Sequence, residues 1–422
     1  MFDLLIRNAA EVLTCTGSPR GDIESALAVI PNGAVGIAGG RVSWVGPAHA
    51  VPSEAVGPST EVLDAEGGTV TPGLVDPHTH LVFAGERAHE FDLRNQGATY
   101  LEIAKAGGGI ANTVKATRAA SEEELVALAL PRLQRLHEQG VTTCEVKSGY
   151  GLNLADELKM LRAVRTLSGM QPVKLVPTLL CAHAVPAELR ENRERYVDLC
   201  VEEILPAVAE EGLAFACDAF CEEGAFTVEE TRRMLTAAAA LGLVPRLHAD
   251  QLTAGGGAQL AAEVRASCAD HLEQVTDEGI EALAGAEVSA VLVPTSTLFL
   301  RMKPYAPGRK LRAAGVNVAL GTNVNPGSSM TENVGLVMGL ACLENGLTAA
   351  EAVWGFTRGA ALAMRMSELG RIAPGDPADL VVFGCSSYRH LPYHLGVNHA
   401  RAVMKAGRVT ARPGGLGAPL CR

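Results

Sequence analysis

The chain has 422 residues, of which 48% are hydrophobic and 20% are charged, a composition typical of a globular protein. No stretch contains the roughly 18 uninterrupted apolar residues of a membrane-spanning helix, so we expect no membrane partner. The formal net charge is −11 without any run of Lys or Arg, which argues against a nucleic-acid partner and favours a small-molecule substrate.

The cysteines and the N-terminal segment both indicate a cytoplasmic protein. The ten cysteines are scattered through apolar segments without a CxxC pair, which is typical of reduced thiols. The first residues place Asp3 and Arg7 among apolar side chains and show no basic start followed by an apolar core. We therefore expect no export signal.

Both ends of the chain have the pattern of a small β-sheet. Residues 2–70 contain short apolar or alternating runs separated by turns, with a hairpin signal at Gly39 and Gly40. Residues 371–384 and 400–410 have the same character. We predict that the two ends complete one domain, although the pattern alone also allows two unrelated β segments.

Between these ends, short buried-type strands alternate with amphipathic helices. Capping boxes, in which a Ser or Thr precedes a Glu by three residues, begin several of the helices. Eight strands are predicted, and they end near residues 80, 150, 183, 223, 250, 273, 297 and 323. This alternation predicts an α/β protein built on a (β/α)8 TIM barrel, whose chemistry lies at the C-terminal ends of the strands.

Polar side chains gather at these predicted strand ends, as a barrel enzyme requires. They are His78, His80, Tyr150, His183, Glu222, His248, Asp250, Gln251, His271, Thr295 and Asn323. Five of the eleven histidines of the chain are in this set, and we expect the other six to contact solvent or local hydrogen-bond partners.

Three of these histidines form a candidate metal site. His78 and His80 are two residues apart near a strand end, where side chains at that spacing point to the same side. His248 ends another strand and supplies a third imidazole. Three imidazoles and an oxygen ligand from the last strand would leave room for a water molecule that Zn²⁺ or Fe acidifies.

Longer motifs resemble a known family. The segment PGLVDPHTH, the barrel strands and the returning GDPADLVVF are similar to the amidohydrolase superfamily. The narrower resemblance, over residues 1–410, is to the imidazolonepropionase family. Its motifs here are HTHLVFAGERAHEF, GGGI, EVKSGYGL, LCAHAVP, HADQL, CADHLE and NPGSS. It implies a composite β-sandwich from residues 1–66 and 369–422 around a barrel of residues 67–368.

The resemblance also implies an activity and a set of site residues. The activity is hydrolytic ring opening of 4-imidazolone-5-propanoate to N-formimidoyl-L-glutamate in histidine degradation. The implied metal ligands are His78, His80, His248 and the residue at position 323, and the implied catalytic residues are His271, Gln251 and Asn323. The implied substrate contacts are Arg87, Tyr100, Tyr150, His183, Gln251, Asn325, Gly327 and Ser328.

The role of Arg87 has an alternative, and the cofactor and the partner follow from the family. Arg87 would bind the propionate carboxylate, but it could instead form an ion pair with Glu86 or Glu90. Some relatives carry a carbamylated lysine that bridges two metals, whereas Lys147 lies on the second predicted strand in EVKSGYGL, as in the one-metal family. The resemblance therefore implies one Zn or Fe ion per chain and a homodimer.

The sequence departs from the family at Asn323, where the family has Asp. An amide oxygen can bind a metal, but it carries no charge and cannot act as a general base. Three hypotheses follow: a working enzyme in which His271 is the base, an impaired or binding-only protein, and an amidohydrolase that deaminates a heterocyclic amine. The third gives no reason for Arg87, Tyr150 and NPGSS to occur together.

Overall fold

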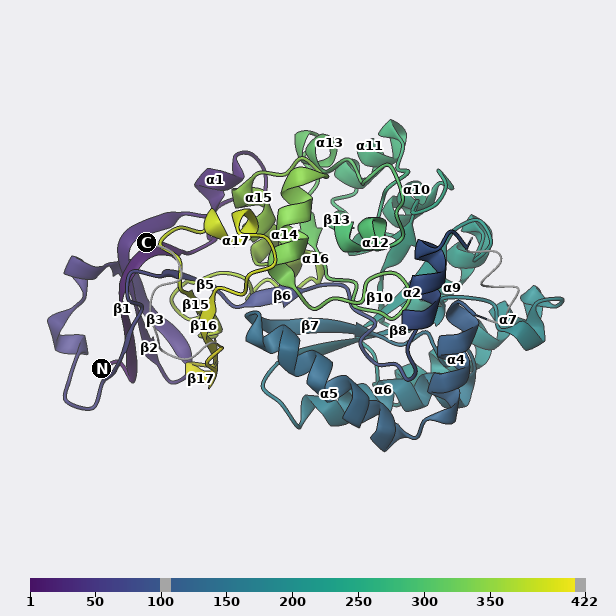
Figure 1. Ribbon diagram of the computed structural model, residues 1–422, viewed down its shortest axis with the longest axis horizontal. Helices are drawn as coiled ribbons and strands as arrows, with labels where there is room; N and C mark the ends of the chain where they lie inside the picture. Colours follow the sequence, from purple (N-terminus) through teal and green to yellow (C-terminus); the bar gives the residue numbers. More distant parts are fainter. Residues whose placement is uncertain (99–107, 414–422) are drawn as a thin grey trace.

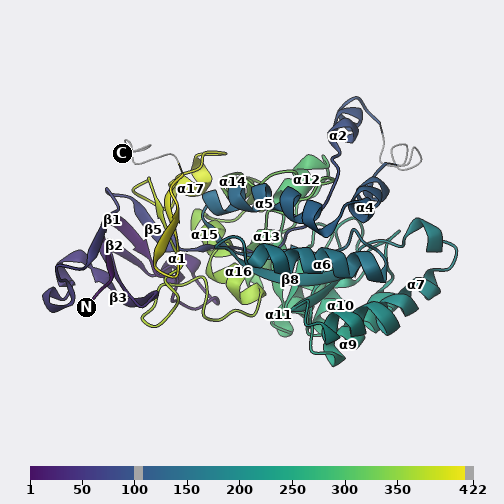
Figure 2. The same ribbon diagram turned by 90° about the horizontal axis from the view of Figure 1, so that it is seen from below.

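A computed structural model describes residues 1–98 and 108–413, which form a β-sheet domain beside a barrel (Figure 1). The first and the last described strands lie together in the β-sheet domain, and the barrel occupies the rest of the described molecule in both views (Figures 1 and 2). Within the described residues, no helix combines the length and the apolar character needed to cross a membrane.

The β-sheet domain contains strands from both chain ends, as predicted. The front of the chain contributes β1 (Leu4–Leu13), β2 (Val29–Ala38), β3 (Arg41–Pro47), β4 (Glu61–Asp64) and β5 (Thr69–Pro72). The back contributes β15 (Leu380–Phe383), β16 (Ala400–Lys405) and β17 (Arg408–Ala411). Their order is β17-β16-β15-β5-β1-β2-β3, with β4 paired to β1.

Strand β5 joins the two halves of this sheet. It pairs in parallel with β1 and antiparallel with β15, where Leu380 lies opposite Pro72. The expected domain boundary after residue 66 places β5 in the barrel, and this is wrong, because β5 bonds to both halves of the terminal sheet. The side chains of Ile6, Val70 and Val382 then share one apolar core.

All eight predicted barrel strands are present and run parallel. They are β6 (Leu74–Asp76), β7 (Val141–Lys147), β8 (Lys174–Ala182), β9 (Ala216–Cys221), β10 and β11 (Val244–Pro245 and Leu247–Ala249), β12 (Cys268–His271), β13 (Ser289–Leu292) and β14 (Val318–Leu320). The fifth strand is divided at Arg246, whose backbone N–H donates to Cys217 O at 2.8 Å.

The seam between β14 and β6 lies directly beside the predicted metal ligands. Asn323 N donates to His78 O at 2.9 Å, and His80 N donates to Val324 O at 3.1 Å. Below them, the Thr322 hydroxyl donates to Asp76 Oδ2 at 2.6 Å. These bonds join the first and last strands, so that residues far apart in sequence reach the same end of the barrel.

Three helices of the barrel begin at the capping boxes that the sequence predicts. The predicted capping boxes form at Ser121 and Glu124, Thr227 and Glu230, and Thr348 and Glu351. The α-helices are α1 (Ile23–Ala26), α2 (Ala88–Asn95), α4 (Ile110–Ala119), α5 (Glu122–Glu138), α6 (Leu154–Ser168), α7 (Arg193–Leu199), α8 (Leu205–Glu210), α9 (Val228–Ala240), α10 (Gly257–Glu263), α11 (Asp277–Gly285), α12 (Pro294–Phe299), α13 (Gly308–Ala313), α14 (Val334–Leu343), α15 (Ala349–Gly355), α16 (Arg358–Ala363) and α17 (His390–Tyr393). Shorter turns are the 3-10 helices Ala48–Ala50, Ser53–Ala55 and Ala187–Leu189 and the π-helix Cys200–Ile204.

Candidate metal centre and active site

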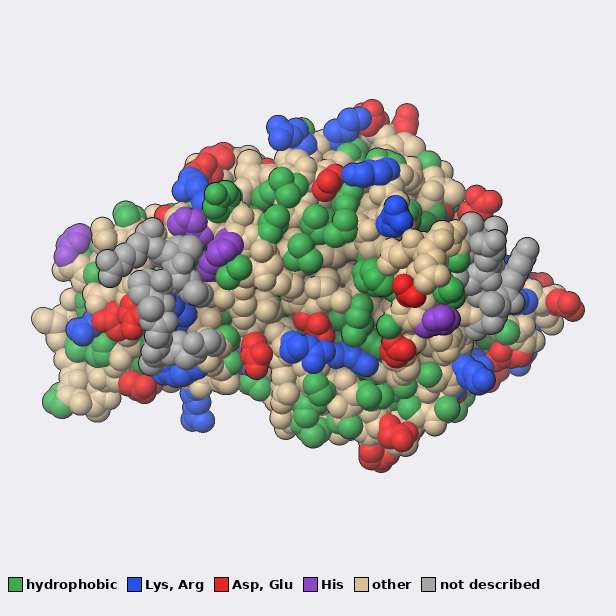
Figure 3. Space-filling view, in the orientation of Figure 1, with side chains coloured by type: hydrophobic (Ala, Val, Ile, Leu, Met, Phe, Trp, Pro, Cys, Tyr) green, Lys and Arg blue, Asp and Glu red, His purple; other side chains and the backbone are tan. Residues whose placement is uncertain are grey.

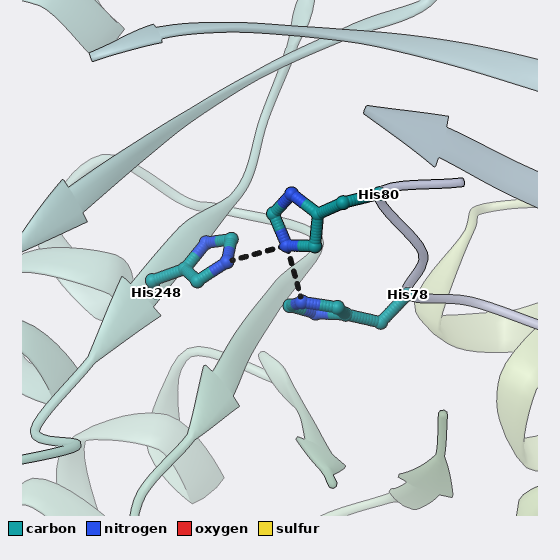
Figure 4. A group of neighbouring side chains, drawn as sticks. All are labelled: His78, His80 and His248. Carbon is teal, nitrogen blue, oxygen red and sulfur yellow. Dashed lines mark hydrogen bonds between the residues drawn. The ribbon is translucent and has the colours of Figure 1, made fainter. Parts of the chain in front are cut away.

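Three imidazoles converge at the C-terminal end of the barrel strands (Figure 4). His78 and His80 follow β6, and His248 lies within β11. His80 Nε2 lies 3.3 Å from His78 Nε2 and 3.4 Å from His248 Nε2. All three side chains are buried, and their ring nitrogens are close enough to hold one metal ion.

The opposite ring nitrogens of two of these histidines face carboxylates. His78 Nδ1 lies 2.6 Å from Asp270 Oδ2, and His248 Nδ1 lies 3.1 Å from Asp218 Oδ2. The first contact is a hydrogen bond, and because an ionised carboxylate can only accept, His78 Nδ1 carries the proton and His78 Nε2 keeps its lone pair. Metal-binding histidines are commonly held in this way.

The charge state of the cluster also fits a metal ion. Burial lowers the pKa of His78 and of His80 well below 6.5, and neighbouring cationic groups lower it further. Both imidazoles are therefore neutral, which is the form that binds a metal. His80 Nδ1 is buried without a hydrogen-bond partner in the described part of the chain.

His271 lies beside the three converging imidazoles. Its ring centroid is 5.6 Å from that of His78 and 5.4 Å from that of His248. Its φ of 80° is unusual for a residue with a side chain and is typical of strained functional positions. Its Nδ1 lies 3.5 Å from Glu273 Oε1, which accepts a hydrogen bond from the Thr297 hydroxyl at 2.8 Å.

Asn323 is buried next to His78 through the backbone bond at the barrel seam. Its φ of 52° is left-handed, a conformation that Asn adopts more readily than most residues. Its Oδ1 accepts a hydrogen bond from Asn325 Nδ2 at 3.1 Å. The amide at this position is therefore already hydrogen-bonded to the turn that follows it.

That turn, residues 325–329, is organised by the Asn325 side chain. Asn325 Oδ1 accepts from the backbone N–H groups of Gly327 and Ser328, each at 2.8 Å. Its Nδ2 donates to Asn323 O at 2.7 Å. Both ends of the Asn325 amide are thus occupied within the turn, which indicates a structural contribution to the site.

Arg87 lies against this turn and forms an ion pair with Glu90, one of the two partners expected from the sequence. Its Nε donates to Glu90 Oε2 at 2.7 Å, and both side chains are largely buried. Nη1 packs against Gly327 so closely that a methyl group at that position would overlap it. The ion pair with Glu90 is made through Nε. No ion pair with Glu86 occurs among the described residues.

Tyr150 and His183 border the imidazole cluster. His183 stacks on His80 with a centroid separation of 5.1 Å, and Tyr150 lies 5.3 Å from His183. His183 Nδ1 lies 3.0 Å from Gly149 O, so it carries the proton and Nε2 is an acceptor. Burial and the charge of His248 lower the pKa of His183 to about 3.

For two other predicted site residues, Gln251 and Tyr100, the described part of the chain gives no side-chain hydrogen bond to the imidazoles. The loop that carries Gln251 is held by Glu222, whose Oε2 accepts from Gln251 N at 3.0 Å and Leu252 N at 2.8 Å. Tyr100 lies outside the described residues.

The site contains four acidic residues that sequence reasoning did not assign to it. They are Asp218 and Asp270, which face the metal-site histidines, Glu273, which faces His271, and Glu90, which holds Arg87. Asp270, Glu273 and Glu90 lie inside motifs already recognised, CADHLE and HTHLVFAGERAHEF. Asp218 and Asp270 could have been found from the sequence, because an acidic residue inside a predicted buried strand indicates a buried charge that needs a partner.

Comparison with known proteins agrees with this architecture. The pattern of the Amidohydrolase family matches residues 61–110 and 100–411. A zinc-bound adenosine deaminase from Xanthomonas campestris has the same fold, with a TM-score of 0.71, 20% identity and coverage of 98% of this chain and 94% of that one. The fold and the imidazole cluster thus define a hydrolase of the amidohydrolase class.

Two curated relatives narrow the assignment. An imidazolonepropionase from Myxococcus xanthus (strain DK1622) is 70% identical over 412 residues, covering 98% of each chain. One from Anaeromyxobacter dehalogenans (strain 2CP-1 / ATCC BAA-258) is 54% identical over 408 residues, covering 96% of this chain and 95% of the relative. The chain belongs to the imidazolonepropionase family.

Proposed function

We propose that the chain opens the ring of 4-imidazolone-5-propanoate by hydrolysis, giving N-formimidoyl-L-glutamate in histidine degradation. The observation that carries the proposal is the convergence of three buried imidazoles, with Arg87 and the turn at Gly327 in the same active-site region. His78, His80 and His248 would hold one ion, Zn²⁺ or Fe, because imidazole ligands suit both. A metal ion bound there supplies Lewis acidity and lowers the pKa of a water molecule.

The side chains around this centre account for the other requirements of the reaction. The terminal nitrogens of Arg87 form a fork that matches the propionate carboxylate. His183 Nε2 accepts a hydrogen bond from a ring N–H, because Nδ1 donates to Gly149 O. Tyr150 covers the same side of the cluster. These contacts orient the ring, and Tyr100 and Gln251 are proposed to complete the pocket.

Proton transfer is assigned to His271. The protonated Nδ1 faces Glu273, so Nε2 is the atom that takes a proton from water and returns it to the leaving nitrogen. Asn323 cannot take that proton because its amide has no basic site near neutral pH. Gly327 and Ser328, shaped by Asn325, would hold the product.

The assay of wild type and Asn323→Asp on imidazolone propionate, with bound metal measured in both, tests this function. We expect the natural chain to bind metal and turn over, and Asn323→Asp to increase metal affinity and rate. A natural chain without metal and turnover, beside a variant that gains both, would favour the second candidate, an impaired or binding-only protein. Asn323 is the observation that favours that candidate.

A panel of amino-heterocycles tests the deaminase alternative. The adenosine deaminase shares the fold of this chain, but 20% identity does not extend its substrate to it. We expect no ammonia from the panel. Ammonia release from any of these compounds, without formimidoyl glutamate from imidazolone propionate, would replace the proposed reaction.

We also propose a cytoplasmic homodimer. The nine cysteines within the described residues are free thiols, as expected in a reducing compartment. Exposed apolar side chains lie at the end of α14 (Leu343), at the end of α17 (Tyr393) and just after it (Leu395), and Figure 3 shows hydrophobic side chains gathered over this face. Sedimentation of the wild type and of Leu343→Asp tests it; a monomeric wild type would contradict the dimer.

A further inference from the structure

Lys147, the last residue of β7, is a buried cation surrounded by carboxylates. Its Nζ donates to Glu145 Oε1 at 2.8 Å and to Asp218 Oδ2 at 2.7 Å. The same nitrogen lies 3.5 Å from Asp270 Oδ2. All of these side chains are 0% exposed, so no water screens the charges.

Two of the three carboxylates hold metal-site histidines directly. Asp270 Oδ2 faces His78 Nδ1 at 2.6 Å. Asp218 contacts His248 twice, because its Oδ1 accepts from the backbone N–H at 3.2 Å and its Oδ2 lies 3.1 Å from Nδ1. Each imidazole therefore takes its orientation from a carboxylate that Lys147 contacts on the other side.

The third carboxylate, that of Glu145, holds the backbone between His78 and His80. Glu145 Oε2 accepts from the N–H of Thr79 at 3.1 Å, and Thr79 separates His78 from His80. The Thr79 hydroxyl donates to the backbone oxygen of Glu145 at 2.6 Å. Through this carboxylate, Lys147 is also connected to the HxH segment.

Arg246 is a second cation in the same cluster. Its Nη2 donates to Pro77 O at 2.6 Å and lies 3.6 Å from Asp270 Oδ2, and its Nε lies 3.8 Å from Glu145 Oε1. Its ion-pair distances to the carboxylates are longer than the two hydrogen bonds of Lys147. Of these two cations, Lys147 is the one that contacts all three carboxylates, so its removal would leave buried like charges without their shared partner.

We propose that Lys147 is a positioning residue for the metal centre, which fixes the carboxylates behind His78, His248 and Thr79 and thereby sets how tightly the chain holds its metal. The inference rests on the proposed metal site. Without the ammonium group, the carboxylates repel one another and turn from the imidazoles, and the Nε2 atoms lose their common direction. Replacing a group that directly contacts a metal ligand typically lowers metal affinity by about 10-fold to 100-fold, and Lys147 acts through two such groups, Asp270 and Asp218.

Zinc affinity of the metal-stripped full-length chain tests the inference, measured by competition with a chromophoric chelator. We expect Lys147→Met to raise the Kd for Zn²⁺ by about 10-fold to 100-fold. The matched control is Lys405→Met, because Lys405 Nζ also pairs with a carboxylate, Asp379 Oδ2 at 2.6 Å, but lies in the terminal sheet. Its Kd should equal that of the wild type.

A second variant keeps the test decisive if Lys147→Met does not fold. Glu145→Gln retains the lysine but removes one charge that it contacts, and we expect a smaller loss of Zn²⁺ affinity. Circular dichroism of the stripped proteins establishes which variants are folded. Wild-type affinity in folded Lys147→Met, or in Glu145→Gln, overturns the inference. A wild-type chain that binds no Zn²⁺ overturns the metal site itself, so the two failures are distinct.

Discussion

The guanidinium of Arg87 packs directly against Gly327, which leaves no room for a side chain at that position. The two residues belong to opposite ends of the barrel sequence, one preceding α2 and the other following β14. Arg87 Nε also donates a hydrogen bond to Glu90 Oε2. This contact joins the proposed carboxylate-binding residue to the proposed product-binding turn.

Replacement of Gly327 by Ala should raise KM for imidazolone propionate and change kcat less. The added methyl group would displace Nη1 of Arg87, which we propose binds the substrate and takes no part in bond cleavage. Gly285→Ala is the control, because nothing lies within 4 Å of a Cβ built at that helical position. Steady-state kinetics of the two variants give the comparison, and an unchanged KM in Gly327→Ala would refute the expectation.

Arg87→Met should lower kcat/KM by about 10-fold to 100-fold, because hydrogen bonds to a charged group contribute about 1.5–3 kcal/mol. A substrate analogue that lacks the propionate carboxylate should be turned over equally by wild type and variant. Arg135→Met, which removes only the surface pair with Glu332, serves as the control. A similar loss on both substrates would show that Arg87 does not act through the carboxylate.

Glu273→Gln should lower kcat by about tenfold or more and leave KM nearly unchanged. Glutamine keeps the size of the side chain but removes the charge that faces His271 Nδ1. Thr297→Val, which removes only the hydroxyl that holds Glu273, should have a smaller effect in the same direction. Glu273→Asp should recover part of the rate; a change confined to KM would contradict the orienting role.

The metal-free chain should lose stability as the pH falls below 6.5. Burial lowers the folded-state pKa of His78, His80 and His183, so these imidazoles stay neutral while those of the unfolded chain take up protons. The contribution of these neutral imidazoles to the free energy of unfolding is fully present above their pKa in the unfolded chain. It is lost as the pH falls toward their pKa in the folded chain, at about 1.4 kcal/mol per pH unit for each imidazole. Urea unfolding at pH 7, 6 and 5 measures this loss; a flat profile would contradict it.

Much of the architecture could be predicted from local pattern alone. Alternation of short apolar strands with capped helices indicated the barrel, and the HxH spacing placed His78 and His80 on one side of the chain. These features depend on periodicity and capping, which neighbouring residues determine. The boundary after residue 66 failed because β5 is assigned to a sheet by its partners β1 and β15, and not by its own residues.

The sequence by itself determined which residue types stand at the strand ends, including the histidines and the change to Asn323. Only the tertiary structure decided their partners: Asp270 for His78, Asp218 for His248, Glu90 for Arg87, and Lys147 for the three carboxylates. The physical reason is that a buried charge is stable only beside groups that compensate it. In a barrel, most of those groups come from other strands, whose distance in sequence carries no information about their distance in space.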